Sequence, residues 1–230
     1  MKTIGLLGGM SWESTVEYYR IMNELVRNRL GGLHSAKCVL YSVNFEEIER
    51  HQANGEWEQA GQLLGDAAYS LEQAGADFIV ICTNTMHKVV KCIEEKIQIP
   101  ILHIADSTAH VIKQAKIKKV GLLGTRYTME QDFYKSRIAS NGIEVIVPQV
   151  NDRSMMNKVI FEELCLGHTI PSSKYYFINV IKGLIDQGAE GIILGCTEIG
   201  LLISQDDVDV PLFDTTQIHA IEAVNVALET

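Results

Sequence analysis

The chain has 230 residues, enough to bury a substantial hydrophobic core as one large domain or two smaller ones. Hydrophobic residues make up 47% of the sequence and charged residues 21%, which is typical of a globular protein and leaves little room for long disorder. The formal charge is −9, and no basic cluster is long enough to follow a nucleic-acid backbone or an anionic membrane. We therefore expect neither nucleic acid nor a membrane as a partner.

The apolar stretch near the N-terminus and the cysteines indicate the cellular compartment in which the protein is expected. The stretch from Ile4 to Met10 is too short and too rich in glycine for a secretory signal, and no stretch approaches the roughly 20 apolar residues of a membrane helix. The five cysteines are an odd number and form no C-x-x-C pair, and the histidines lack the spacing of metal ligands. We predict a cytoplasmic protein whose cysteines are thiols and which holds no metal.

Short apolar runs alternate with longer amphipathic segments along the chain. The runs that we expect to be buried strands are Thr3–Leu7, Val39–Val43, Phe78–Ile81, Val120–Leu123, Glu144–Val147 and Gly191–Leu194. Such alternation predicts parallel strands joined by helical crossovers. The fold class is therefore α/β, with ligands bound at the carboxyl ends of the strands.

The second half of the sequence roughly repeats the first. The matching segments are 2–9 with 119–125, 75–83 with 188–197, and 99–101 with 210–212. Three matches in the same order predict duplication of one α/β unit, although two chance strand-cysteine turns in a repetitive chain are the alternative. Duplication implies two pseudo-symmetric lobes, each a mainly parallel sheet flanked by helices, with the active site in the cleft between them.

Cys82 and Cys196 occupy equivalent places in this repeat. Each ends an apolar strand and is followed by a threonine, Thr83 or Thr197, and then by an acceptable helix start. Symmetry would place the two cysteines facing each other across the cleft. A helix N-terminus favours negative charge, so we expect the pKa of each thiol to be lowered from about 8.5. The same amides could hold a substrate carboxylate.

Polar residues after each cysteine are candidates for substrate contacts. Thr83 and Thr197 offer hydroxyl groups to a thiolate or to the substrate, and Asn84 and Thr85 offer further donors. Glu198 has two interpretations. It is either a carboxylate that favours the first turn of a helix or a group that tunes Cys196 and a bound ammonium.

Two equivalent thiols favour a reaction that inverts a stereocentre. A proton must leave one face of the α-carbon and return to the other, and one base cannot reach both faces. A thiolate and a thiol of similar character supply an interchangeable base and acid. The alternative, a cysteine nucleophile with His87 as its base, does not explain the second cysteine.

Three motifs carry a resemblance to a known family. Residues 5–10 (GLLGGM), 82–85 (CTNT) and 195–198 (GCTE) resemble the signatures of the aspartate/glutamate racemase family, over essentially the whole chain. Residues 12–15, 124–131 and 160–167 are similar to the branch with broad-specificity bacterial amino-acid racemases. The resemblance implies a racemase without PLP or any other cofactor, Cys82 and Cys196 as the catalytic pair, and a homodimer.

The resemblance also implies binding residues and lobe boundaries. Asn84, Thr85 and Thr197, with backbone near Met10 and Thr125, would bind the α-groups of the amino acid. The segment from near Pro211 would cross back to complete the first lobe. The implied lobes are residues 1–99 with 210–230, and residues 100–209.

One departure from the family concerns the substrate. Relatives dedicated to aspartate carry a basic residue where Cys165 stands here, whereas Arg50 and Arg126 are other possible sources of positive charge. Aspartate, glutamate and a neutral amino acid such as homoserine therefore stay open, and we favour broad specificity. Cys38, Cys92 and Cys165 are expected in the core or a pocket wall.

Two rival functions share this architecture. One is a cysteine-dependent isomerase or decarboxylase of small diacids. The other is a non-catalytic amino-acid-binding protein, which would need no thiols. A nucleotide site is disfavoured because Gly5-x-x-Gly8-Gly9 does not have the G-x-G-x-x-G spacing and no acidic residue closes the second strand.

Overall fold

The structure is a computed structural model that describes residues 1–229, and these form two compact units. The first unit contains residues 1–104 and the segment from His219 onward, and the second contains residues 105–218. The strands are β1 (Ile4–Gly8), β2 (Cys38–Ser42), β3 (Phe78–Ile81) and β4 (Ile101–Leu102) in the first unit, and β5 (Lys119–Gly124), β6 (Glu144–Ile146), β7 (Gly191–Gly195) and β8 (Leu212–Asp214) in the second.

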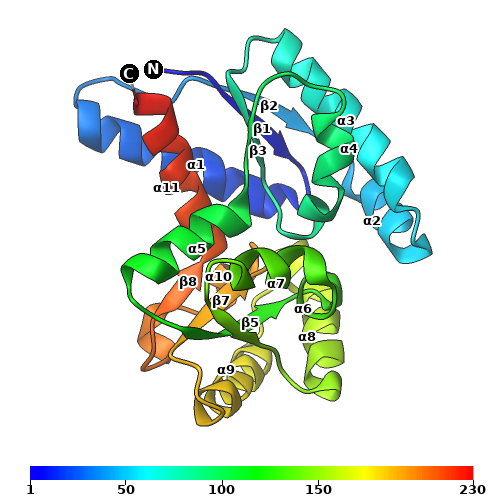
Figure 1. Ribbon diagram of the computed structural model, residues 1–230, viewed down its shortest axis with the longest axis vertical. Coiled ribbons are helices and arrows are strands. Elements are labelled where there is room, and N and C mark those ends of the chain that lie inside the picture. Colours follow the sequence, from blue (N-terminus) through cyan, green and yellow to red (C-terminus); the bar gives the residue numbers. More distant parts are fainter. Residues whose placement is uncertain (230) are drawn as a thin grey trace. The chain divides into compact units, whose positions relative to one another are not determined.

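Helices connect these strands in both units (Figure 1). In the first unit they are α1 (Trp12–Leu30), α2 (Phe45–Asn54), α3 (Trp57–Gln73), α4 (Val90–Glu94) and the 3₁₀ helix η1 (Thr85–Val89). In the second they are α6 (Arg126–Glu130), α7 (Asp132–Ala139), α8 (Val150–Glu162), α9 (Pro171–Asp186), α10 (Ile199–Leu202) and the 3₁₀ helices η2 (Leu164–Leu166) and η3 (Gln205–Asp207). Two helices, α5 (Ile104–Gln114) and α11 (Thr215–Leu228), contain the points where the chain passes between the units. Within residues 1–229, every helix is too short or too polar to cross a membrane.

The two sheets have the same strand order. The first runs β2-β1-β3-β4 and the second β6-β5-β7-β8, and each described pair of neighbouring strands is parallel. The registers correspond as well, since Leu7 lies opposite Ile81 and Leu123 opposite Leu194. The prediction of an α/β fold with two similar parallel sheets is confirmed, and all six predicted strands are present.

Helices cover both faces of the first sheet. Leu7 and Ile81 lie in a cluster with residues of α2, α3 and α4, whereas Leu6 and Val80 pack against α1 and α11 on the opposite face. Figure 1 shows α1 and α11 together on one side of this sheet and α3 and α4 on the other. Because both faces are covered, β1 and β3 are apolar throughout, as expected for central parallel strands.

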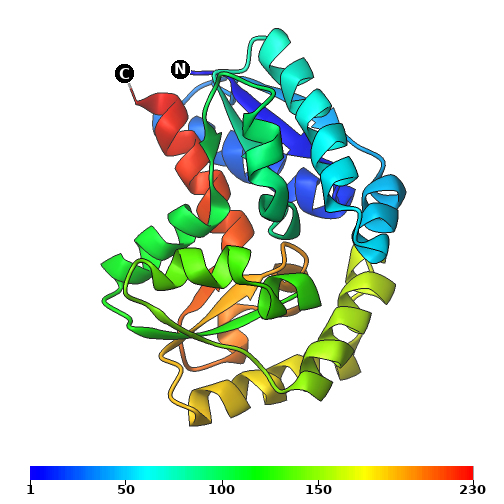
Figure 2. The same cartoon turned by 45° about the vertical axis from the view of Figure 1, so that its right-hand side comes forward.

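The second sheet is built in the same way. Leu123, Ile192 and Leu194 pack against residues of α8, α9 and α10 in one buried cluster. Figure 2 shows α8 and α9 along one side of this unit. The carboxyl ends of the central strands β5 and β7 lie side by side at one edge, with Gly124 opposite Gly195.

Strand β8 belongs to the second sheet. It pairs with β7, with Ile192 opposite Leu212. The resemblance to the family implies that residues 210–230 complete the first lobe, but this pairing keeps residues 212–214 in the second sheet. The chain returns to the first unit at His219.

His219 is fully buried where the chain re-enters the first unit. Its Nε2 lies 2.9 Å from the carbonyl oxygen of Leu102, which can only accept, so Nε2 carries the proton. Its Nδ1 then accepts the hydroxyl of Tyr18 at 2.9 Å. Burial lowers the pKa of His219 from 6.5 to about 4, since a charged ring would lose its hydration there.

This burial predicts a loss of stability in mild acid. Below pH 6.5 the unfolded chain takes up a proton at His219 that the folded chain does not bind until about pH 4. The free energy of unfolding should therefore fall by roughly 3 kcal/mol between pH 7 and pH 4 through this residue. Urea unfolding of wild type and His219→Gln across this range should show a shallower dependence in the variant. The exposed His110→Gln is the control, and equal slopes for all three proteins would contradict the assignment.

Candidate active site

Cys82 directly follows β3 at the carboxyl edge of the first sheet. Its backbone N–H donates to the Leu7 carbonyl at 2.9 Å, and its Sγ lies 3.7 Å from the Val80 carbonyl oxygen, with no exposed surface. Gly9, at the end of the neighbouring strand, has φ +91°. A Cβ there would lie 2.4 Å from the Val43 carbonyl oxygen, so only glycine allows this close approach.

The first unit brings together four of the predicted binding residues near Cys82. Thr83, Asn84 and Thr85 follow it and are buried, and Asn84 is the N-cap of the 3₁₀ helix η1. Met10 is buried just beyond β1, the strand beside β3. The helix start predicted after Cys82 is therefore present, but it is a 3₁₀ helix of five residues.

Cys196 follows β7 at the corresponding edge of the second sheet. Its Sγ lies 2.9 Å from Oε2 of Glu198, and the Thr197 hydroxyl donates to the same oxygen at 2.9 Å. All three side chains are buried. Glu198 is also the N-cap residue of α10, which has four residues. A carboxylate at this distance can accept the proton of the Cys196 thiol.

Thr125 directly follows the neighbouring strand β5, at the same edge of the sheet. Gly124 and Gly195 are opposite each other in the register, so Thr125 and Cys196 follow adjacent strand ends. A Cβ at Gly124 would lie 2.9 Å from the Gly195 carbonyl oxygen, which explains the glycines at these ends. The Thr125 hydroxyl accepts the Thr128 N–H at 3.3 Å and so caps α6.

The thiol pKa values differ from the sequence prediction. Burial raises the pKa of the Cys82 thiol, and burial followed by the charge of Glu198 raises the pKa of the Cys196 thiol well above its ordinary value. The prediction of lowered values is wrong for this structure. Helices of five and four residues present small dipoles, and loss of hydration outweighs them.

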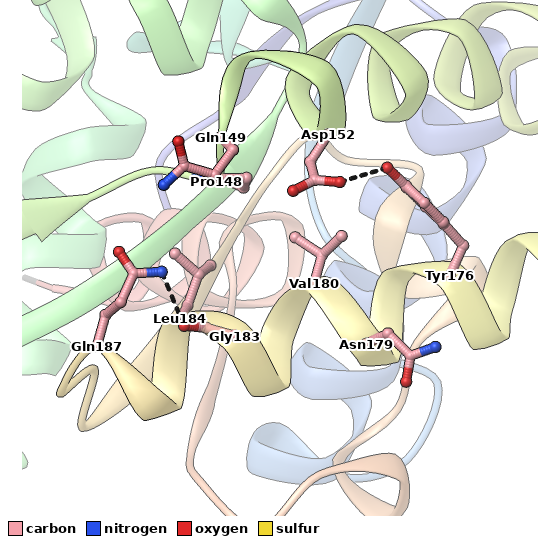
Figure 3. A pocket seen from close by; sticks show the side chains of 9 residues that line it. All are labelled: Pro148, Gln149, Asp152, Tyr176, Asn179, Val180, Gly183, Leu184 and Gln187. Carbon is pink, nitrogen blue, oxygen red and sulfur yellow. Dashed lines mark hydrogen bonds between the residues drawn. The ribbon is translucent and has the colours of Figure 1, made fainter.

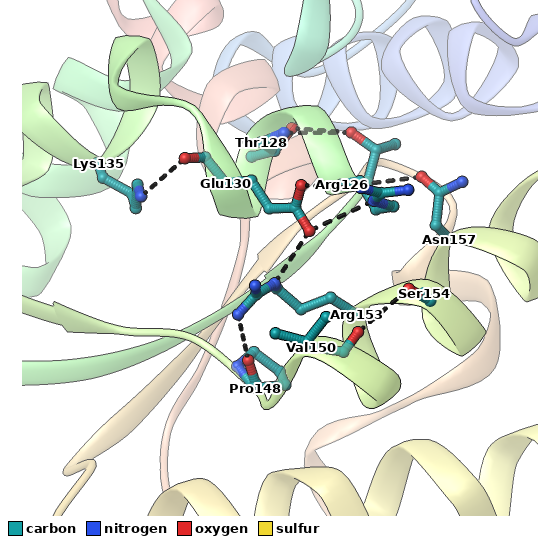
Figure 4. Close-up of polar contacts among 10 residues, drawn as sticks. Arg126, Thr128, Glu130, Lys135, Pro148, Val150, Arg153, Ser154 and Asn157 are labelled. Atoms are coloured by element: carbon teal, nitrogen blue, oxygen red, sulfur yellow. Dashed lines mark hydrogen bonds and ion pairs between the residues drawn. The ribbon is translucent and has the colours of Figure 1, made fainter.

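Arg126 is held within the second unit. It lines a pocket of about 290 Å³ with Glu130 and Asn157. Glu130 accepts hydrogen bonds from Arg126 at 3.3 Å and from Arg153 at 3.1 Å, as Figure 4 shows. Burial acts to raise the pKa of Glu130, but these two guanidinium groups hold it below its ordinary value. Arg126 is therefore engaged by a carboxylate of its own unit.

Two other residues bear on the recognition of a negatively charged substrate side chain, namely Arg50 and Cys165. Arg50 is exposed on α2, and Cys165 is half-buried in η2, packed against the cluster that contains Cys196.

A second groove, of about 240 Å³, lies between the start of α8 and α9 (Figure 3). There the Tyr176 hydroxyl donates to Asp152 at 2.6 Å, and burial and this carboxylate raise the pKa of Tyr176 to about 12. The groove is lined by residues that the sequence does not single out.

Two further side chains contact the backbone just after the cysteines. His87 Nδ1 lies 2.8 Å from the Thr83 carbonyl oxygen, and Thr216 Oγ1 lies 3.4 Å from the Thr197 carbonyl oxygen. The sequence suggests His87 only as an alternative base. It offers no signal for Thr216, because this contact joins residues that are 19 apart and belong to different elements.

These observations define an α/β protein of two similar units, each with a buried Cys-Thr pair at the end of the same strand. The family model for Asp/Glu/Hydantoin racemases matches residues 7–223, and the chain belongs to this family. Its members are cofactor-independent amino-acid racemases, so the resemblance inferred from the motifs is confirmed.

Individual relatives agree with this membership. The crystal structure of a candidate Asp/Glu racemase from Yersinia pestis is 58% identical, covers all of both chains and has a TM-score of 0.92. An aspartate racemase homologue from Pyrococcus horikoshii is 37% identical over the full length of both chains, with a TM-score of 0.86. The broad specificity amino-acid racemase RacX of Bacillus subtilis is 28% identical over 163 residues, which are 71% of this chain and 70% of RacX.

The contact between Cys196 and Glu198 can be tested by thiol labelling. Glu198→Gln removes the negative charge while keeping an acceptor, so the pKa of Cys196 should fall and its labelling by iodoacetamide at pH 8 should rise, on the order of 10-fold for each pKa unit. Peptide mass spectrometry would follow Cys196, with Cys82 in the same protein as the control. Unchanged or slower labelling of Cys196 in the variant would show that Glu198 does not hold its proton.

Proposed function

We propose that this protein racemises amino acids, with Cys82 and Cys196 as the two groups that exchange the α-proton. One observation carries the proposal. A buried cysteine followed by a buried threonine ends the third strand of a four-stranded parallel sheet twice, in two units of the same strand order. Membership of a racemase family supports the same conclusion.

The proposed reaction conserves protons. The thiolate of one cysteine removes the α-proton and becomes a thiol, leaving a carbanion stabilised by the adjacent carboxylate. The thiol of the other cysteine then gives its proton to the opposite face and becomes a thiolate. Either cysteine can start, because the reverse reaction uses the same two groups in the opposite order.

Ionisation of a buried thiol needs compensation. Burial raises the pKa of both cysteines, so a thiolate requires positive charge nearby. The ammonium group of a bound amino acid brings such a charge. At Cys196 the requirement is larger, because the Glu198 carboxylate 2.9 Å from Sγ adds a negative charge that also raises the thiol pKa. Met10, Thr83, Asn84, Thr85, Thr125 and Thr197 are proposed to hold the α-carboxylate and α-ammonium groups.

For the substrate we propose broad specificity, including aspartate, glutamate and uncharged amino acids such as homoserine. Arg126 is engaged by Glu130, and Cys165, packed near Cys196, carries no fixed positive charge. The name of the Bacillus subtilis relative agrees with a broad range. A cytoplasmic homodimer made of two-lobed subunits is part of the same proposal.

Proton NMR in deuterium oxide tests this function directly. With L- and D-aspartate, glutamate and homoserine and without PLP, the α-proton signals should disappear and the opposite enantiomer should accumulate. Cys82→Ser and Cys196→Ser should each slow racemisation by about 10²- to 10⁴-fold, because each removes one proton-transfer group. Cys92→Ser, in α4, is the matched control.

Other results would favour the rival functions. If no amino acid exchanges its α-proton with solvent, the protein is not a racemase, and isomerisation of diacids or amino-acid binding without catalysis becomes the favoured function. Loss of activity in only one of the two serine variants would indicate a single nucleophilic cysteine.

A further inference from the structure

In each unit a buried side chain holds the carbonyl group of the threonine that follows the cysteine. His87, 2% exposed, contacts the Thr83 carbonyl oxygen at 2.8 Å, and Thr216, 3% exposed, contacts the Thr197 carbonyl oxygen at 3.4 Å. The two holding residues differ in type and in place along the chain. His87 contacts the loop after Cys82, and Thr216 contacts the loop after Cys196.

The protonation of His87 follows from two of its hydrogen-bond partners, and its ring also lies 4.4 Å from the ring of His103 and 6.0 Å from that of His219. The Thr83 carbonyl can only accept, so Nδ1 carries the proton. The Ile104 N–H can only donate, and it lies 3.3 Å from Nε2, which is therefore the acceptor. His87 is a neutral ring that joins the loop after Cys82 to the first residue of α5. Ile104 is also the last residue of the first unit before the chain leaves it.

Thr216 has a comparable setting in the second unit. It is the second residue of α11, and its N–H donates to Asp214 Oδ1 at 2.8 Å. The preceding residue, Thr215, donates its hydroxyl to the Leu194 carbonyl at 2.7 Å and so fixes the start of α11 on β7. Each cysteine loop is thus attached to a helix through which the chain passes between the units.

We propose that His87 and Thr216 are positioning residues, His87 for Cys82 and Thr216 for Cys196. This rests on the proposed racemase function. Each holds the carbonyl group of the threonine that follows one cysteine and thereby limits the movement of that cysteine's Sγ. A displacement of about 1 Å can cost on the order of 10²-fold in rate. Loss of one contact slows one proton transfer and leaves the other intact.

The overall rate of racemisation cannot show which of the two proton transfers a variant slows. The equilibrium constant between enantiomers is 1, so kcat/KM falls equally in both directions for any variant. The primary deuterium isotope effect on kcat/KM does separate the two steps, when it is measured with each 2-deuterated enantiomer. A slower transfer at Cys82 raises the effect for the enantiomer that Cys82 deprotonates and lowers it for the other.

The variants come in matched pairs. His87→Gln loses the N–H that donates to the Thr83 carbonyl. His87→Asn places an amide N–H where Nδ1 of His87 lies and should restore this hydrogen bond. Thr216→Val loses the hydroxyl, and Thr216→Ser retains it. Tyr18→Phe is the control for an indirect effect, because it removes a buried hydrogen bond to His219, whose ring lies 6.0 Å from that of His87, and leaves the contact between His87 and Thr83 in place. The substrate is the amino acid that wild type racemises fastest.

We expect kcat/KM to fall about 10- to 100-fold in His87→Gln and Thr216→Val, with isotope effects that shift in opposite directions in the two variants. His87→Asn and Thr216→Ser should return the isotope effects toward wild type. Shifts in the same direction, no shifts, or equal shifts in Tyr18→Phe would overturn the proposal.

A second measurement does not depend on turnover. Iodoacetamide labelling should rise several-fold at Cys82 alone in His87→Gln and at Cys196 alone in Thr216→Val. Equal increases at both cysteines, in step with a lowered Tm, would mean that the contacts only stabilise the fold. If wild type racemises no amino acid but labelling is selective, the proposed function fails while the positioning of the two thiols stands.

Discussion

A buried thiol holds its proton more tightly than an exposed one, and this constraint governs both halves of the molecule. Cys82 and Cys196 end central strands that are covered on both faces, so burial raises the pKa of each. The same burial would keep water away from a carbanion and strengthen every nearby electrostatic interaction. At Cys196 the negative charge of Glu198 adds to the effect of burial on the thiol pKa.

The two halves share an architecture but differ in chemistry. The repeat places Asn84 and Glu198 at corresponding positions after the cysteines, and only the second is a carboxylate in contact with the thiol. A racemase has no need for two identical environments, because the energies of the two enantiomers in solution are the same. Different surroundings on the two faces alter the rates of the individual proton transfers and leave the equilibrium unchanged.

Much of the fold was predictable because apolar runs mark strands buried on both faces. The short edge strands β4 and β8 were not, since two or three residues after a proline carry little periodicity. The internal repeat identified the two cysteines as candidates. The direction of their pKa shifts depends on how deeply they are buried, which a sequence motif does not show. Thr216 and the pairing of Arg126 with Glu130 depend on three-dimensional placement and were not predictable either.

The discontinuous first unit has a consequence for biosynthesis. Ala220, Ala223, Val224 and Ala227 of α11 are fully buried against α1, β1 and β3, yet residues 105–218 are synthesised in between. On the ribosome, the second unit can complete its sheet while one face of the first sheet still lacks its helix. The nascent first unit therefore exposes an apolar surface until α11 emerges, and such a surface is prone to aggregation during translation.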